Sequence, residues 1–114
     1  MNKRIKKLWV AALRSGEYTQ GRGRLRNRAD EFCCLGVLCN IHAQEHPEIA
    51  AAQRTSLEYM GSYAQLPKAV VRWAGLETSP GTCVRIAGNL NFLAVYNDRG
   101  VSFSQIADAI EEQL

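Results

Sequence analysis

The sequence has no apolar run of the roughly 20 residues that a membrane-spanning helix requires, so we expect no membrane association. Positive charge at the N-terminus could open a signal peptide, but Lys6 and Lys7 interrupt the apolar stretch that such a peptide needs. Repeats and low-complexity segments are also missing. With 46% hydrophobic and 22% charged residues, the chain has the composition of one globular domain, which we place at residues 1–114.

Sequence motifs of catalysis are missing as well. There is neither a Walker phosphate loop nor a Gly-x-Gly-x-x-Gly motif, and Gly21 and Gly23 are not followed by Lys-Ser/Thr. Glu111 and Glu112 are adjacent, so on a helix they do not face each other as an acid and base would. The cysteines and histidines lack the strand-turn-helix setting that presents a nucleophile. We therefore expect a protein that is not an enzyme and needs no cofactor.

Four cysteines are present, three of them within seven residues: Cys33, Cys34, Cys39 and Cys83. Such crowding suits buried, reduced thiols better than a disulfide framework, and it indicates the cytosol. A zinc site is the alternative, because Cys39, His42 and His46 fall on one face of an expected helix and Cys83 could supply a fourth ligand. The spacing lacks a second close pair of ligands, so we expect no metal.

Positive charge is concentrated at one end of the chain. Residues 1–28 contain nine Lys or Arg and one Glu, a local charge of +8, whereas residues 29–114 contain five basic and ten acidic residues, a charge of −5. The net charge of +3 hides this asymmetry. The basic end is expected to attract anions such as phosphate groups.

Hydrophobic periodicity predicts a helix at each end of the chain. Near the N-terminus, apolar residues recur at helical spacing up to a stop at Gly16: Ile5, Leu8, Trp9, Ala12 and Leu13. Near the C-terminus, Ser102 and Gln105 form a capping box ahead of an apolar face that includes Ile106 and Ile110. Both helices therefore have an apolar face for a shared core.

The internal elements expected from periodicity are helices over residues 32–45, 49–52, 67–74 and 90–97 and strands over residues 18–28 and 82–86. A connector is expected over residues 48–65 and a turn over residues 79–81. Gly75 should end the helix over residues 67–74. The predicted fold class is α+β, with a small antiparallel sheet flanked by N-terminal and C-terminal helices.

Four arginines alternate with other residues in the predicted strand over residues 18–28: Arg22, Arg24, Arg26 and Arg28. Because alternate side chains of a strand point to the same side, this spacing predicts four guanidinium groups on one face. Guanidinium groups bind phosphate oxygens two at a time, so the row is a candidate phosphate site. The alternative is a solvated basic edge strand whose charges discourage pairing with other strands.

Asn97 and Asp98 are the second candidate for ligand binding. Their amide and carboxylate could contact the hydroxyls or the base of a nucleotide whose phosphates lie on the arginine row, and an aromatic residue could stack on the base: Tyr18, Phe92 or Tyr96. The alternative for the pair is ordinary turn chemistry ahead of Gly100. For the aromatic residues, the alternative is a place in the core.

Several segments together resemble a known family. They are Trp9-Val-x-Ala-Leu-Arg-Ser-Gly-Glu-Tyr-x-Gln20, Leu25-Arg26, Phe32-Cys-Cys-Leu-Gly-Val-Leu-Cys39, Tyr96-Asn-Asp-x-Gly100 and Ser102-Phe-x-x-Ile-Ala-Asp-x-Ile-Glu111. The set resembles small proteins of bacteriophages and prophages. Within that group it is similar to the Thoeris anti-defence family, whose members sequester the host's cyclic ADP-ribose-type immune signal.

The resemblance implies a homo-oligomeric protein in the cytoplasm of the infected bacterial host. It implies that a cyclic ADP-ribose-type or cyclic oligonucleotide signal is bound and not cleaved. Such proteins hold phosphate and base with an arginine after the first strand and an asparagine in the C-terminal half. The best-matching positions are Arg26, with its neighbouring arginines, and Asn97. Asn40 departs from the pattern, in which an acidic residue follows the cysteine block.

Two other functions would use the same basic residues. One is a small phage regulator that binds nucleic acid through the N-terminal helix and the arginines. The C-terminal segment from Ser102 resembles the first helix of a helix-turn-helix, but we expect no recognition helix after it, so nucleic acid is not the ligand we favour. The other is direct docking onto a host defence protein through the basic face.

Overall fold

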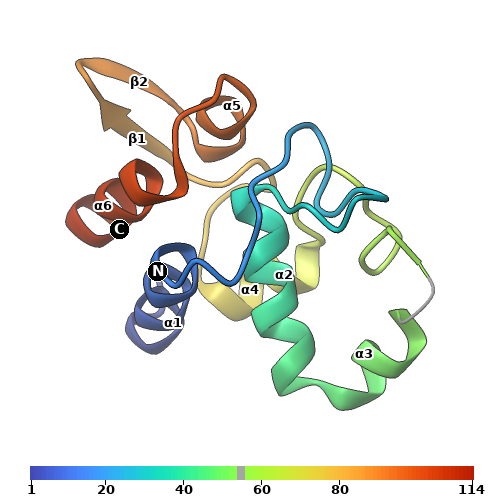
Figure 1. The fold of residues 1–114 in the computed structure, drawn as a ribbon. Helices are drawn as coiled ribbons and strands as arrows, with labels where there is room; N and C mark the ends of the chain where they lie inside the picture. Colours follow the sequence, from blue (N-terminus) through green and yellow to red (C-terminus); the bar gives the residue numbers. More distant parts are fainter. Residues whose placement is uncertain (54–55) are drawn as a thin grey trace.

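A computed structural model describes residues 1–53 and 56–114 of the chain (Figure 1). Within them the chain forms six helices and two strands: α1 Lys3–Arg14, α2 Cys34–Glu45, α3 Pro47–Gln53, α4 Lys68–Ala74, β1 Cys83–Ile86, β2 Asn89–Phe92, α5 Leu93–Asp98 and α6 Phe103–Gln113. The α+β class, the small antiparallel sheet and the helices at both ends are confirmed. Positions 54 and 55 of the expected connector lie outside the described residues.

The first helix, α1, packs against α6 and α2, so both ends of the chain join one core (Figure 1). Ile5 and Trp9 are buried as expected, and the indole Nε1 of Trp9 donates a hydrogen bond to the carbonyl of Cys34 at 2.9 Å. The expected apolar stripe is wrong at one position, because Leu8 is 40% exposed and Val10 is buried. Contact with two helices turns the buried face of α1 toward Val10.

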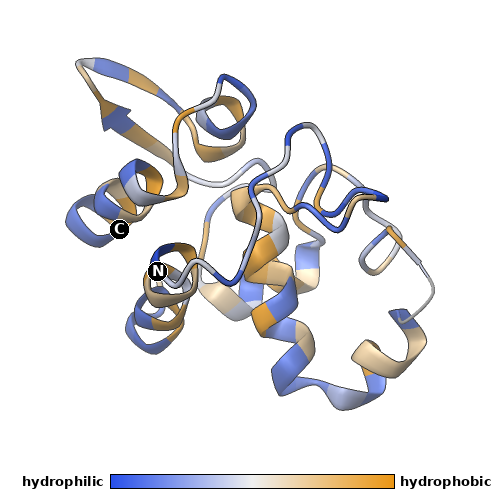
Figure 2. Ribbon diagram, viewed as in Figure 1, coloured by the Kyte–Doolittle hydropathy of each residue, from blue (hydrophilic) through white to orange (hydrophobic). Residues whose placement is uncertain are grey.

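Helix α2 is the centre of the fold. Every residue from 34 to 39 is buried, and Figure 2 shows the hydrophobic colour gathered in this half of the helix. The expected helix over residues 32–45 is confirmed, with its start at Cys34. Gly36 is required by a close approach: a Cβ there would lie 1.8 Å from the carbonyl oxygen of Leu25. The loop that precedes α2 therefore crosses the helix at Gly36.

The sheet in the described part of the chain is one antiparallel hairpin, with Ile86 of β1 opposite Asn89 of β2. Its two-residue turn consists of Ala87 and Gly88, at φ 50° and 83°, which suits the twist of a tight hairpin. The helix expected over residues 90–97 is therefore wrong in its first part. The tight turn pairs residues 89–92 with β1, and α5 begins only at Leu93.

The strand expected over residues 18–28 is wrong. Residues 20–32, here called the arginine loop, are irregular, and their bridges are isolated ones from Gln20 and Arg26 to Phe32. Gly23 interrupts extended geometry with φ 76°. Leu25, which lies between two arginines, is buried where the loop meets α2. Burial of this leucine therefore determines the path of the loop.

Local end signals are confirmed elsewhere. Ser102 and Gln105 form the expected capping box of α6, and Gly75 ends α4 with φ 70°. All four cysteines are free thiols, as expected. No helix of the described residues is long and apolar enough to span a membrane.

Candidate functional site

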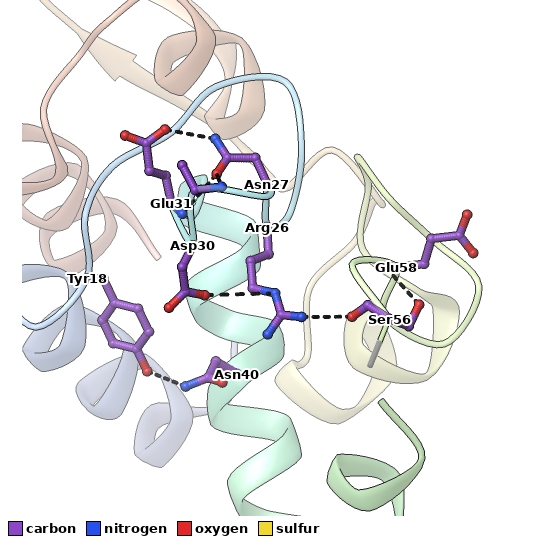
Figure 3. A network of polar contacts seen from close by, with 9 residues as sticks. Tyr18, Arg26, Asn27, Asp30, Glu31, Asn40, Ser56 and Glu58 are labelled. Carbon is purple, nitrogen blue, oxygen red and sulfur yellow. Dashed lines mark hydrogen bonds and ion pairs between the residues drawn. The ribbon is translucent and has the colours of Figure 1, made fainter. Parts of the chain in front are cut away.

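The four arginines of the arginine loop do not share a face, so the predicted row is wrong. The guanidinium of Arg22 lies beside Gly100, where an added Cβ would be 2.8 Å from Nη2. Arg26 extends instead over α2 toward Ser56 (Figure 3). The side chains diverge because the loop turns at Gly23 and is not an extended strand.

Arg24 and Arg28 share an open hollow of about 470 Å³, whose lining is completed by Asn27, Ala29 and Leu57. Arg24 lies over the exposed ring of Tyr63, with Cζ 5.4 Å from the ring centroid, a distance that suits a cation–π contact. No carboxylate is among the lining residues of this hollow in the described part of the chain. Two positive charges therefore border one surface depression.

Leu57 also lines a smaller cavity of about 140 Å³ between the arginine loop, α2 and α3. Most of its walls are apolar or aromatic: Leu25, Phe32, Ala43, Ala50, Leu57 and Tyr59. Arg26, Asn40 and Glu58 are among its polar lining residues. The arginine loop thus borders two adjoining spaces, one basic and open, the other largely apolar.

Arg26 is partly engaged by the protein. Its Nη2 donates a hydrogen bond to the carbonyl of Ser56 at 2.9 Å, and its Nε is 4.0 Å from Oδ1 of Asp30 (Figure 3). The side chain is 33% exposed. Within residues 1–53 and 56–114, Nη1 forms no hydrogen bond, and the side chain lines the smaller cavity.

A turn at Asn27 fixes the arginines at their base. The side-chain Oδ1 of Asn27 accepts hydrogen bonds from the backbone N–H groups of Ala29 and Glu31, both at 3.0 Å. Its Nδ2 donates to Oε1 of Glu31 at 2.8 Å (Figure 3). These contacts close the loop between Arg26 and Phe32 and hold Arg26 and Arg28 at defined positions.

Asn97 does not face a ligand site, contrary to the expectation that it reads a nucleoside. It is fully buried. Its Oδ1 accepts hydrogen bonds from the backbone N–H of Cys34 at 3.1 Å and from Nε2 of Gln20 at 3.0 Å, and its Nδ2 donates to the carbonyl of Gly21 at 2.8 Å. Asn97 therefore joins α5, the start of α2 and the arginine loop, and it acts as a positioning residue.

Asp98 and Gln20 complete this anchor. Oδ1 of Asp98 accepts a hydrogen bond from the backbone N–H of Gly23 at 2.8 Å, although the residue as a whole is exposed. Gln20 donates to the carbonyl of Val101 at 2.8 Å and accepts from the N–H of Phe103 at 3.0 Å. One end of the arginine loop is thereby attached to the turn between α5 and α6.

Two of the aromatic candidates, Tyr18 and Tyr96, lie in the protein interior or against it, and Phe92 is partly exposed at the end of β2. The ring of Tyr18 packs edge-on against Phe32 with centroids 5.2 Å apart, and its hydroxyl accepts a hydrogen bond from Nδ2 of Asn40 (Figure 3). Tyr96 is buried, with its hydroxyl 2.9 Å from the carbonyl oxygen of Val84. Asn40 thus holds Tyr18 and lines the small cavity.

Burial keeps the thiols of the cysteine block protonated. It raises the pKa of Cys33 to about 11 and the pKa values of Cys34 and Cys39 well above their usual range. Among the described residues, no three metal-ligating side chains gather at one place. His42 and His46 instead stack on each other with ring centroids 4.0 Å apart.

Sequence reasoning missed three residues that shape the two spaces: Asn40, Leu57 and Tyr63. Leu57 and Tyr63 lie in the connector, where no periodicity gave a signal. Asn40 lies three residues before Ala43 on the predicted helix, so their shared face was predictable but the cavity beside it was not.

Fold and site together define a small α+β protein in which a braced basic loop borders an open hollow and a cavity. The chain belongs to the family described as Domain of unknown function (DUF8296), whose model matches residues 1–114. No curated protein and no solved structure matches the chain.

Proposed function

We propose that this protein binds and sequesters a phosphate-bearing cyclic nucleotide of the cyclic ADP-ribose type without cleaving it. In this role it is a bacteriophage anti-defence protein that acts in the cytoplasm of the infected host and withholds an immune signal from its receptor. The resemblance of residues 9–20, 32–39 and 96–111 to the Thoeris anti-defence family supports this role.

The shared hollow of Arg24 and Arg28 is the observation that carries the proposal. Guanidinium groups form paired, charge-assisted hydrogen bonds with phosphate oxygens. The two arginines border one depression that has no carboxylate among its described lining residues, so their charge is not neutralised there. A diphosphate placed between them would supply the missing negative charge.

Preorganisation also supports capture of a ligand at low concentration. A loop that is already held in its binding conformation loses less entropy when the ligand arrives. The arginine loop is braced by Asn27 inside it and by Asn97 and Asp98 beneath it. In the proposed function, Asn97 and Asp98 therefore contribute by positioning the loop.

A homo-oligomer is part of the proposal because the hollow is open on the single chain. Pockets that retain small ligands usually bury most of the ligand surface. A second subunit packed over the arginine loop would provide that enclosure, as the resemblance implies. Native mass spectrometry with cyclic ADP-ribose reports subunit number and bound mass in one measurement.

The test is calorimetric binding of cyclic ADP-ribose to the wild-type protein and to Arg24→Ala and Arg28→Ala. Each variant should bind at least about tenfold more weakly, because each loses a charge-assisted contact worth about 1.5–3 kcal/mol. Arg72→Ala is the matched control, since Arg72 is an exposed arginine of α4 outside the hollow. Wild-type affinity in both loop variants would contradict the proposal.

The fate of the ligand separates the proposal from its rivals. After denaturation of the complex, chromatography should return the ligand unchanged, whereas a cleaved product would identify an enzyme. Duplex DNA should bind weakly. Tight duplex binding that falls steeply with salt, because neutralised phosphates release counterions, would instead support a nucleic-acid-binding regulator.

A further inference from the structure

We infer that the cavity beside Arg26 receives a nucleobase, so that the ligand spans from phosphates at Arg24 and Arg28 to a base among Phe32, Tyr59 and Arg26. The inference rests on the proposed function, which it deepens by dividing the site into a phosphate half and a base half. It also assigns Arg26 to the base, whereas Arg24 and Arg28 bind the phosphates.

The size of the cavity limits what it can hold. Pockets for whole drug-sized ligands measure roughly 300–1,000 Å³. The cavity beside Arg26, at about 140 Å³, is smaller than this range. A space of this size suits one ring system better than a whole nucleotide.

The chemistry of the walls favours a base over a phosphate. Phe32 and Tyr59 provide aromatic surface, and Ala43 and Ala50 provide apolar surface. A doubly charged phosphate would lose hydration against such walls, whereas every base has a flat face that packs on aromatic and apolar side chains.

The state of Arg26 agrees with this division. Its Nη2 donates a hydrogen bond to the carbonyl of Ser56, and Oδ1 of Asp30 lies 4.0 Å from its Nε. The carboxylate of Asp30 therefore offsets part of the positive charge of Arg26. Nη1 makes no hydrogen bond among the described residues. The N–H groups of Nη1 suit a ring nitrogen or carbonyl of a base, which is the kind of acceptor that arginine reads in nucleic acids.

Contiguity links the two halves. Leu57 lines both the hollow of Arg24 and Arg28 and the cavity of Arg26. In a nucleotide the base and the phosphates are separated by one ribose. Leu57 would lie beneath this sugar, with the phosphates on its basic side and the base on its apolar side.

The experiment compares ADP, which has both phosphates and a base, with inorganic pyrophosphate, which has only the phosphates. The wild-type protein should bind ADP at least tenfold more tightly than pyrophosphate, because stacking of the base adds to the phosphate contacts. Ala43→Leu fills the cavity from α2 and should abolish this advantage while leaving pyrophosphate binding unchanged. Ala11→Leu, an equal enlargement at an exposed position of α1, should change neither affinity.

Unchanged pyrophosphate binding by Ala43→Leu also shows that the variant is folded. A second measurement uses the wild-type protein alone: the methyl NMR signals of Ala43 and Ala50 should shift with ADP and stay in place with pyrophosphate. Equal affinities for ADP and pyrophosphate, or no methyl shift with ADP, would overturn the base site and leave the phosphate site standing. Failure of the wild-type protein to bind either compound at low salt would overturn both.

Discussion

Removal of the Asn97 side chain tests whether the arginine loop depends on a buried anchor. In Asn97→Ala, the backbone N–H of Cys34 and the carbonyl of Gly21 each lose their side-chain partner. Gln20 keeps its bond to the carbonyl of Val101, so we count only two orphaned groups. A buried polar group without a partner costs about 1–3 kcal/mol, which gives a loss of about 2–6 kcal/mol in the free energy of unfolding.

The assay is urea unfolding followed by circular dichroism, with Asn89→Ala as the control. Asn89 is an exposed asparagine at the tip of the hairpin, and we expect its replacement to change stability by less than about 0.5 kcal/mol. A total stability of about 5–15 kcal/mol is typical of a domain of this kind, so the loss at Asn97 should be obvious. If Asn97→Ala and Asn89→Ala unfold at the same urea concentration, the hydrogen bonds of Asn97 do not contribute to the free energy of unfolding.

Trypsin provides a second, local measurement of the same anchor. Cleavage after Arg22 or Arg24 requires the arginine loop to detach from the protein surface. Asn97→Ala should accelerate cleavage at these two bonds more than cleavage after Arg72, an exposed residue of α4. Equal acceleration at all three bonds would show global destabilisation without local release of the loop.

Two further perturbations address the core. Gly36→Ala places a Cβ 1.8 Å from the carbonyl oxygen of Leu25, so the arginine loop must move off α2. We expect thermal or denaturant unfolding to show a loss of about 3 kcal/mol or more in the free energy of unfolding. A loss below about 1 kcal/mol would show that the loop adjusts freely where it crosses α2. Burial, with a contribution from nearby His46, lowers the pKa of His42 below its ordinary value of 6.5, so the unfolded chain takes up this proton first as the pH falls. The contribution of His42 to the free energy of unfolding should therefore be complete above about pH 6.5 and decline as the pH drops below it. His42→Phe should reduce the slope of stability against pH in this range. An unchanged slope in that variant would show that His42 is not the group responsible.

Much of the helical framework was predictable because its signals are local. The capping box of Ser102 and Gln105 and the stop at Gly75 act within a few residues of the helix ends that they define. The continuous apolar segment before Asn40 predicted a buried helix for a similar reason, since its length exceeds that of an ordinary strand.

The strand prediction failed at the arginine loop because the alternation there is one of charged residues and not of buried, apolar residues. The predicted strand had arginines at every second position, but a strand also needs partners for its backbone. The loop finds such partners at isolated points, including Phe32, and a side-chain amide, Asn97, takes the place of a neighbouring strand at Gly21. Helical spacing from Leu90 misled likewise, because the turn at Ala87 and Gly88 pairs the following residues with β1.

By itself, the sequence determined the helices at both ends, the buried helix between them, the α+β class and the basic character of the first quarter of the chain. These properties follow from neighbours along the chain, through periodicity, caps and charge counts. Only the tertiary structure decided where the arginines point and that Asn97 is an anchor. Those outcomes depend on groups far apart in the chain. Asn97 forms hydrogen bonds with residues 63 and 76 positions away. Leu25 packs against α2 at Gly36, where any larger residue would collide with its carbonyl oxygen.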